Sequence, residues 1–153
     1  MNKQPHWPRG PKHTLCQKQC FPDMRPSSHV ILAWVVVALY TSLIFALSAL
    51  SHPPVPGWDL PHLDKVYHSI EYVLLAFLLI RALRKTWLTH PGARLIYWGV
   101  ALTGFYGLTD EFHQAFTPGR VMSVYDLMAD AVGASVVGLL WTIMQRRWPT
   151  IVT

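Results

Sequence analysis

The sequence predicts an all-α integral membrane protein, a four-helix protein with both termini in the cytoplasm. Of its 153 residues, 52% are apolar and only 14% are charged, whereas about 25% are charged in soluble domains. The apolar residues fall into four blocks, each close to the roughly 20 residues that a helix needs to cross a bilayer. Positive charges gather on alternate connections between these blocks, which predicts an orientation.

The four predicted spans form one membrane domain, residues 30–145. The first span, near residues 30–50, is longer than the roughly 7 to 15 residues of a signal-peptide core, so we expect a retained anchor. Cleavage at Ala46-Leu47-Ser48 is the alternative. The other spans, near residues 64–83, 95–116 and 124–144, are polar at one end only. Helices of a soluble bundle would instead be polar along one whole face.

The N-terminal segment, residues 1–29, is basic and rich in Pro. It has too few apolar residues to fold alone, so we expect a disordered cytoplasmic tail, with Met24 as an alternative start. His13, Cys16 and Cys20 resemble half of a zinc site, but the second pair of ligands is missing. We therefore expect two reduced cytoplasmic thiols.

Positive charge predicts the orientation. Only Lys65 and Arg120 of the 13 Lys and Arg residues lie in the first and third connections. The other Lys and Arg residues lie in the tails and the second connection. Cytoplasmic segments of membrane proteins are enriched in Lys and Arg. This places residues 1–29 and the second tail, residues 146–153, inside. The net charge of +5 follows from the same bias and predicts contact with a lipid bilayer, with no nucleic acid as partner.

Six of the eight carboxylates lie within or beside the apolar spans. A charged side chain in the bilayer costs at least about 2.5 to 3.5 kcal/mol on insertion scales, so such residues are candidates for function. In the predicted orientation all six fall in or near the outer leaflet. They are Asp64, Glu71, Asp110, Glu111, Asp126 and Asp130.

Helical spacing arranges these acids into stripes at one end of the protein. Residues at i, i+4 and i+7 share a helix face. Asp64, His68 and Glu71 therefore share a face of the second span, and Asp126 and Asp130 share a face of the fourth. Both stripes begin at the outer end of their span.

The third span contributes the remaining stripe. Asp110 lies with His113 and Gln114 about one turn on, whereas Glu111 lies about 100° away. Three polar stripes that converge at one end predict an outward-facing acidic and histidine pocket. Its candidate residues are Asp64, Lys65, His68, Glu71, Asp110, Glu111, His113, Gln114, Arg120, Asp126 and Asp130.

Small residues predict close helix packing beside this pocket. Gly99, Thr103 and Gly107 recur every four residues on the third span. Ala134 and Gly138 do so on the fourth. Such stripes allow neighbouring membrane helices to approach closely.

Three motifs resemble the signature of VanZ-like membrane proteins. They are Asp64-Lys65-x-x-His68, the run TDEFHQAFTPGR that ends at Arg120, and the run DLMADAVGA that begins at Asp126. This resemblance covers roughly residues 60–140. It implies a small multi-pass protein of the bacterial cytoplasmic membrane, and the founding type of the family is associated with low-level resistance to the glycopeptide teicoplanin. Many members of the family have Asn at the position of Asp130, so the carboxylate is a departure from the resemblance and adds a negative charge.

One hypothesis makes the pocket a receptor in the bacterial cell envelope. It would bind an envelope precursor or lipid and so affect glycopeptide tolerance. Arg120, in the turn Thr117-Pro118-Gly119-Arg120, can bind a phosphate or carboxylate with two parallel hydrogen bonds. The structural alternative is that Arg120 forms an ion pair with Asp126 or Glu111 and orders the loop.

A second hypothesis is a membrane-embedded hydrolase or phosphoryl-transfer enzyme that acts on an envelope lipid. His68 and Glu71 place a nitrogen and an oxygen on one face, and Asp110 with His113 repeat this pair on the third span. A divalent metal held by these four would offset the negative charge and activate water. No Ser or Cys has a recognised nucleophile context, so the pattern names no catalytic residue.

Two further interpretations assign less to the pocket. Asp64 and Asp126 can act as helix caps, although Glu71, Asp110 and Asp130 lie deeper, where a cap is not needed. Ion transport also uses acids within the membrane. A relay needs groups across the whole depth, and the sequence places no carboxylate in the inner half of any span.

Overall fold

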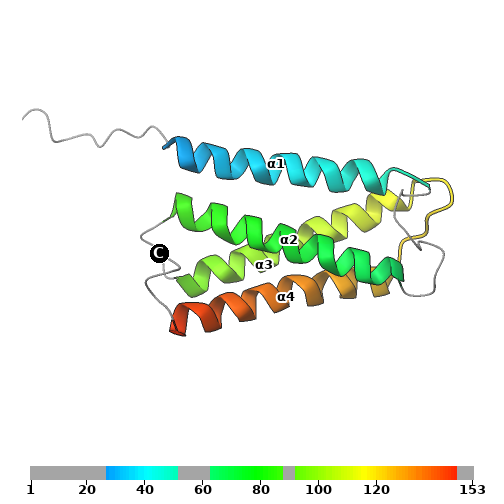
Figure 1. The fold of residues 1–153 in the computed structure, drawn as a ribbon. Coiled ribbons are helices and arrows are strands. Elements are labelled where there is room, and N and C mark those ends of the chain that lie inside the picture. Colours follow the sequence, from blue (N-terminus) through cyan, green and yellow to red (C-terminus); the bar gives the residue numbers. More distant parts are fainter. Residues whose placement is uncertain (1–26, 52–62, 88–91, 148–153) are drawn as a thin grey trace, which may run out of the picture.

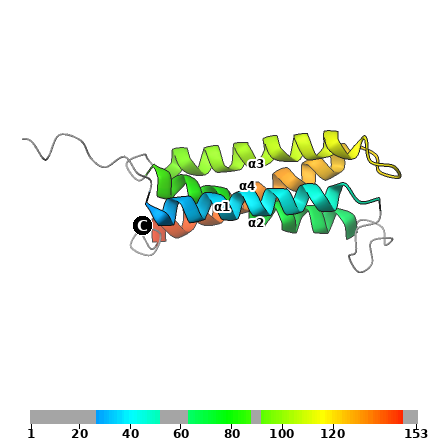
Figure 2. The same cartoon turned by 90° about the horizontal axis from the view of Figure 1, so that it is seen from above.

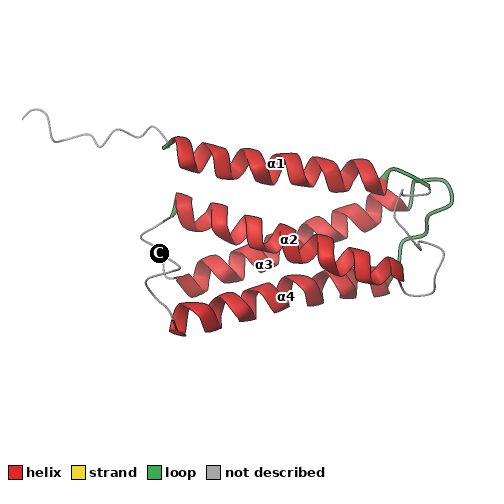
Figure 3. Ribbon diagram, viewed as in Figure 1, coloured by secondary structure: helices red, strands yellow, loops and turns green. Residues whose placement is uncertain are grey.

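The computed structural model describes residues 27–51, 63–87 and 92–147. These residues form four long helices and no strand (Figure 3), which confirms the predicted all-α fold class. The helices are α1 (Ser28–Ser48), α2 (Leu63–Thr86), α3 (Gly92–Gln114) and α4 (Val124–Arg147). The predicted basic tail, which contains His13, Cys16 and Cys20, lies outside the described residues. So do the connection between α1 and α2, residues 52–62, and the last six residues.

The helix ends differ from the predicted spans by at most three residues. At one end, α2 continues through Arg84 and Lys85, and α4 continues through Arg146 and Arg147. Lys and Arg are good helix formers, and their long side chains carry the charge away from the apolar region. A helix therefore extends past the point where the apolar sequence stops.

The chain runs back and forth along the length of the bundle (Figure 1). α2, α3 and α4 pack on one another, and α1 packs mainly on α2 and also contacts α3. No contact between α1 and α4 occurs within the described ranges. Figure 2 shows α3 beside α1 when the bundle is seen from above.

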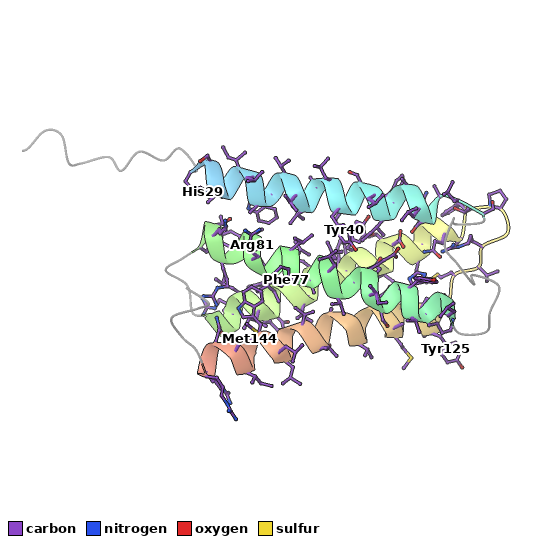
Figure 4. The ribbon with its side chains drawn as sticks, in the orientation of Figure 1. His29, Tyr40, Phe77, Arg81, Tyr125 and Met144 are labelled. Atoms are coloured by element: carbon purple, nitrogen blue, oxygen red, sulfur yellow. The ribbon has the colours of Figure 1, made fainter. Side chains whose placement is uncertain are left out.

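This alternation creates two chemically different ends. The polar end, as we call it, is formed by the last turns of α1 and α3 and the first turns of α2 and α4. The opposite, basic end carries Arg84, Lys85, Arg146 and Arg147 in the last turns of α2 and α4. Figure 4 shows Tyr125 at the polar end and His29, Arg81 and Met144 toward the basic end.

The outward faces of the helices are apolar. Leu39 of α1, Phe105 of α3 and Leu139 of α4 are each more than 60% exposed, as expected for helices that are surrounded by lipid. Helices α1, α2 and α4 are long and apolar enough to cross a membrane. α3 is equally long and packs against α2 and α4, and its membrane crossing stays a prediction from the sequence.

Two apolar clusters hold the helices together. One joins α1 to α2 and the other joins α2, α3 and α4. Both clusters lie beside the acidic residues or between them and the basic end. The buried side chains of the first cluster include Val37, Ile44, Tyr72, Leu75 and Leu79. Those of the second are Ala76, Ile80, Ile96, Ala134 and Val137.

Glycines allow α2 to approach its neighbours. A Cβ atom at Gly133 of α4 would lie 2.5 Å from the carbonyl oxygen of Ser69 in α2. A Cβ atom at Gly99 of α3 would overlap the side chain of Ile80. Thr103, between the glycines of α3, is fully buried. The predicted small-residue stripes therefore face other helices.

Tyrosine hydroxyls attach α1 to the rest of the bundle. The Tyr40 hydroxyl of α1 donates to the carbonyl oxygen of Glu71 at 3.2 Å, and Tyr40 points into the bundle in Figure 4. The Tyr106 hydroxyl of α3 donates to the carbonyl oxygen of Thr41 in α1 at 2.6 Å. Both bonds lie near the middle of the bundle.

The charge difference between the two ends predicts the orientation in the membrane. We expect a reporter inserted into residues 52–62 to be external and one fused after Trp87 to be cytoplasmic, because the basic residues remain on the cytoplasmic side. Paired fusions to alkaline phosphatase and to a fluorescent protein measure this directly. The opposite labelling pattern would place the polar end in the cytoplasm.

Candidate functional site

The polar end brings together every candidate residue whose side chain the structure describes. The side chain of Asp64 lies outside the described residues, although its backbone is part of α2. Lys65, Glu71, His113 and Arg120 are partly buried. Buried side chains come from three helices, namely His68 of α2, Asp110, Glu111 and Gln114 of α3, and Asp126 and Asp130 of α4.

His68, Glu111 and Asp130 form a central cluster where α2, α3 and α4 meet. One ring nitrogen of His68 and one carboxylate oxygen from each acid all lie within 4.8 Å of one another. The closest approach is 3.3 Å, between Nδ1 of His68 and Oδ1 of Asp130, whose side chains are 6% and 1% exposed. Their relative geometry is not that of a hydrogen bond.

The Glu111 carboxylate is fixed from the start of α4. Its Oε2 atom accepts a hydrogen bond from the backbone N–H of Ser123 at 2.8 Å. Ser123 in turn caps the helix, because its Oγ accepts the N–H of Asp126 at 3.3 Å. Asp126 lies in the first turn of α4, where a negative charge interacts favourably with the helix dipole.

A second polar group runs from α1 to the loop after α3. Ser48 Oγ donates to Oδ2 of Asp110 at 2.8 Å, and Gln114 Nε2 donates to the same oxygen at 2.9 Å. A terminal guanidinium nitrogen of Arg120 donates to Oε1 of Gln114 at 2.7 Å. The bonds to the carboxylate are charge-assisted and so stronger than neutral ones.

The loop turns back on itself to place Arg120. The N–H of Arg120 donates to the carbonyl of Thr117 at 3.0 Å, and Gly119 has a φ of 81°. Pro118 followed by glycine with positive φ is the pattern of a type II turn. This turn returns the chain over the end of α3, which is why Arg120 reaches Gln114.

Lys65 and Asp126 join the first turns of α2 and α4. Lys65 Nζ lies 2.6 Å from Oδ1 of Asp126, and their side chains are 30% and 11% exposed. The sequence had offered Asp126 or Glu111 as a partner for Arg120. Asp126 is instead held by Lys65, and Glu111 is held by Ser123.

The four metal ligands proposed from the sequence are not assembled as one set. Of His68, Glu71, Asp110 and His113, only His68 belongs to the described group with metal-ligand spacing. His113 stacks on Phe45 of α1, with ring centroids 4.1 Å apart. Asp110 is occupied by Ser48 and Gln114. The other two members of that group are Glu111 and Asp130, which were proposed from the sequence as pocket residues and not as metal ligands.

A protein-family model of VanZ/LLP1 matches residues 24–145. The chain belongs to the VanZ/LLP1 family. The matched range contains all three motifs and both groups of the polar end, which confirms the resemblance drawn from the sequence. No curated protein and no solved structure matches the chain at a significant level.

In this VanZ/LLP1 protein the central cluster holds an excess of negative charge. Two ionised carboxylates at such a separation repel by about 3 to 4 kcal/mol at an effective dielectric of about 20. Lys65, the cation in the first turn of α2, is paired with Asp126. The cluster therefore requires a proton or a bound cation beside Glu111 and Asp130.

A pocket of about 340 Å³ lies at the basic end of the VanZ/LLP1 bundle. Its surface is largely apolar, and it contains none of the candidate residues. It lies at the opposite end of the bundle from the buried acids and histidines. Its lining residues are Leu83, Trp87, Arg94, Leu95, Trp98 and Leu102.

Proposed function

We propose that the polar end binds the head group of an envelope lipid or lipid-linked precursor in the outer leaflet, and that this binding raises glycopeptide tolerance. The observation that carries the proposal is the hydrogen-bonded chain Ser48–Asp110–Gln114–Arg120. It fixes a guanidinium in a turn whose neighbouring residues, Pro118, Gly119 and Val121, are exposed.

Arg120 supplies the anion-binding part of this receptor. A guanidinium has five N–H donors in a planar fork that matches a phosphate or carboxylate. Gln114 holds the side chain in place, so less conformational freedom is lost when a ligand binds. Phosphate and carboxylate groups are both found on envelope precursors.

Two hydrogen-bond acceptors close to the Ser48–Asp110–Gln114–Arg120 network suit the rest of such a head group. Oδ1 of Asp110 and Nδ1 of His113 are buried and lack a hydrogen-bond partner among the residues described. An unsatisfied buried acceptor costs about 1 to 3 kcal/mol. A hydroxyl, amide or ammonium donor on the ligand would offset this cost. The combination favours a head group that carries both an anion and hydrogen-bond donors.

Membership in the VanZ/LLP1 family and the predicted orientation support an envelope role. The founding type is associated with teicoplanin resistance, and teicoplanin acts outside the cytoplasmic membrane. If the basic end is cytoplasmic, the polar end faces the leaflet in which lipid-linked precursors are exposed.

Replacement of Arg120 by Gln is expected to abolish the gain in teicoplanin tolerance of a susceptible Gram-positive host that expresses this protein. The change removes the charge and the paired donors on which anion binding depends. Minimum inhibitory concentrations at matched expression, with native mass spectrometry of bound lipid, provide the measurement.

Arg94→Gln is the matched control, because Arg94 is an exposed arginine in the first turn of α3 at the basic end. We expect it to retain both tolerance and bound lipid. Equal tolerance in Arg120→Gln and wild type would refute the proposal, and so would equal losses in the two variants.

A further inference from the structure

The central cluster has the composition and spacing of a three-ligand metal site. It offers one imidazole nitrogen and two carboxylate oxygens, all within 4.8 Å of one another. Zinc binds such atoms at about 2.0 to 2.2 Å, so two ligands on one tetrahedral ion lie roughly 3.4 Å apart. The 3.3 Å between His68 Nδ1 and Asp130 Oδ1 already has this value.

Unpartnered polar atoms provide the second observation. Nδ1 of His68, Oε1 of Glu111 and both carboxylate oxygens of Asp130 are buried and have no hydrogen-bond partner in the part of the chain that the structure describes. His68 is 4% exposed, and the two acids are fully buried. Buried polar groups are normally hydrogen-bonded or bound to a metal.

From these observations we propose that His68, Glu111 and Asp130 bind one divalent transition-metal ion of the zinc type between α2, α3 and α4. A dipositive ion and two carboxylates give a neutral site, which suits a buried position. Imidazole favours zinc and its neighbours in the first transition series over magnesium or calcium, which prefer all-oxygen ligands.

The surroundings of the ligands fit this role. The backbone N–H of Ser123 fixes the Oε2 atom of Glu111 and leaves Oε1 for the ion, an arrangement in which an outer hydrogen bond orients a metal ligand. Gly107 of α3 leaves space for the Asp130 carboxylate, because a Cβ atom at this position would lie 2.9 Å from Oδ2 of Asp130. The site is thus supported from α3 and from the start of α4.

Three protein ligands leave at least one coordination position open to water or to an oxygen of a ligand. The metal site does not rest on the proposed head-group binding, because its ligands exclude Arg120, Gln114 and Asp110.

The test uses the purified full-length chain in nanodiscs without an affinity tag. The protein is stripped with a chelator, loaded with Zn²⁺, desalted and analysed for zinc by mass spectrometry. We expect one zinc per chain and an at least tenfold loss in His68→Ala and in Asp130→Asn. His113→Phe is the matched control, because it replaces a histidine outside the cluster, and it should keep the metal.

Two additions keep the result unambiguous. The variant with His13→Ala, Cys16→Ser and Cys20→Ser should keep the zinc, which excludes the N-terminal tail as the binding site. X-ray absorption of zinc-loaded wild type should show nitrogen and oxygen ligands without sulfur, and this holds even if a cluster variant fails to accumulate.

Zinc at the level of the empty-nanodisc blank in wild type would overturn the proposal and leave protons to neutralise the carboxylates. Retention of zinc in Asp130→Asn, or sulfur ligands, would also overturn it. Arg120→Gln should keep the metal, so failure of the head-group proposal and failure of the metal site give different results.

Discussion

Gly133→Ala is expected to destabilise the bundle by about 1 to 3 kcal/mol, the usual range for overpacking a tight interface. The added Cβ atom would lie 2.5 Å from the Ser69 carbonyl oxygen and 3.3 Å from the Val73 backbone nitrogen. Backbone atoms cannot rotate away as a flexible side chain can. α2 and α4 must therefore move apart, and a bulkier Gly133→Leu change should prevent native packing.

Unfolding by sodium dodecyl sulfate in mixed micelles, followed by circular dichroism, measures this loss. Gly104→Ala is the matched control on α3, because a Cβ atom at Gly104 meets nothing within 4 Å. It should leave stability unchanged or raise it by up to about 1 kcal/mol through helix propensity. Equal stability of Gly133→Ala and wild type would show that the two helices are not in close contact there.

Loss of either partner of the ion pair between Lys65 and Asp126 should destabilise the polar end. Breaking a buried pair costs about 3 to 5 kcal/mol, whereas an exposed pair contributes about 0.2 to 1 kcal/mol. With side chains 30% and 11% exposed, we expect about 1 to 3 kcal/mol for Lys65→Met or Asp126→Asn. Their double variant should lose less than the sum, because no partner is left uncompensated.

The same unfolding measurement gives the coupling energy of this pair. Asp126→Asn combined with Arg147→Met is the matched double variant, since Arg147 is exposed in the last turn of α4. Distant changes add, so this second cycle should show no coupling. Additive effects for Lys65 and Asp126 would mean that their contact contributes nothing to stability.

The fold was predictable because each span is a continuous apolar run and each connection is polar. The ends were predicted less well, because hydropathy falls at the basic residues that finish α2 and α4 while the helix continues through them. The pairing of helices cannot be read from such runs. Nothing in the apolar pattern of α1 indicates that it contacts α2 and α3 without contacting α4.

The site was predicted as a set of residues and not as an arrangement. His68 of α2 and Asp130 of α4 face each other across the interface between these helices, with 3.3 Å between Nδ1 and Oδ1. α3 buries two faces at its end, so Asp110 contacts Ser48 of α1 while Glu111 joins His68 and Asp130. A single helical wheel cannot assign adjacent residues to two different neighbours.

Ser48 was the residue of the polar network that the sequence did not reveal. It had been considered only as part of a weak cleavage motif. Only its position indicated a role. Ser48 places a hydroxyl at the end of an apolar span, and this span ends at the same end of the bundle as the acids. Such a signal becomes visible only when the direction of each span is considered.

The attachment of α1 through tyrosine hydroxyls has an evolutionary consequence. The Tyr40 hydroxyl bonds to the main-chain oxygen of Glu71, and the main-chain oxygen of Thr41 accepts the bond from Tyr106. Main-chain oxygens are present whatever the side chain, so substitutions at the accepting positions leave both bonds available. Substitutions at positions 41 and 71 during evolution therefore leave these two attachments of α1 in place, as long as Tyr40 and Tyr106 are kept.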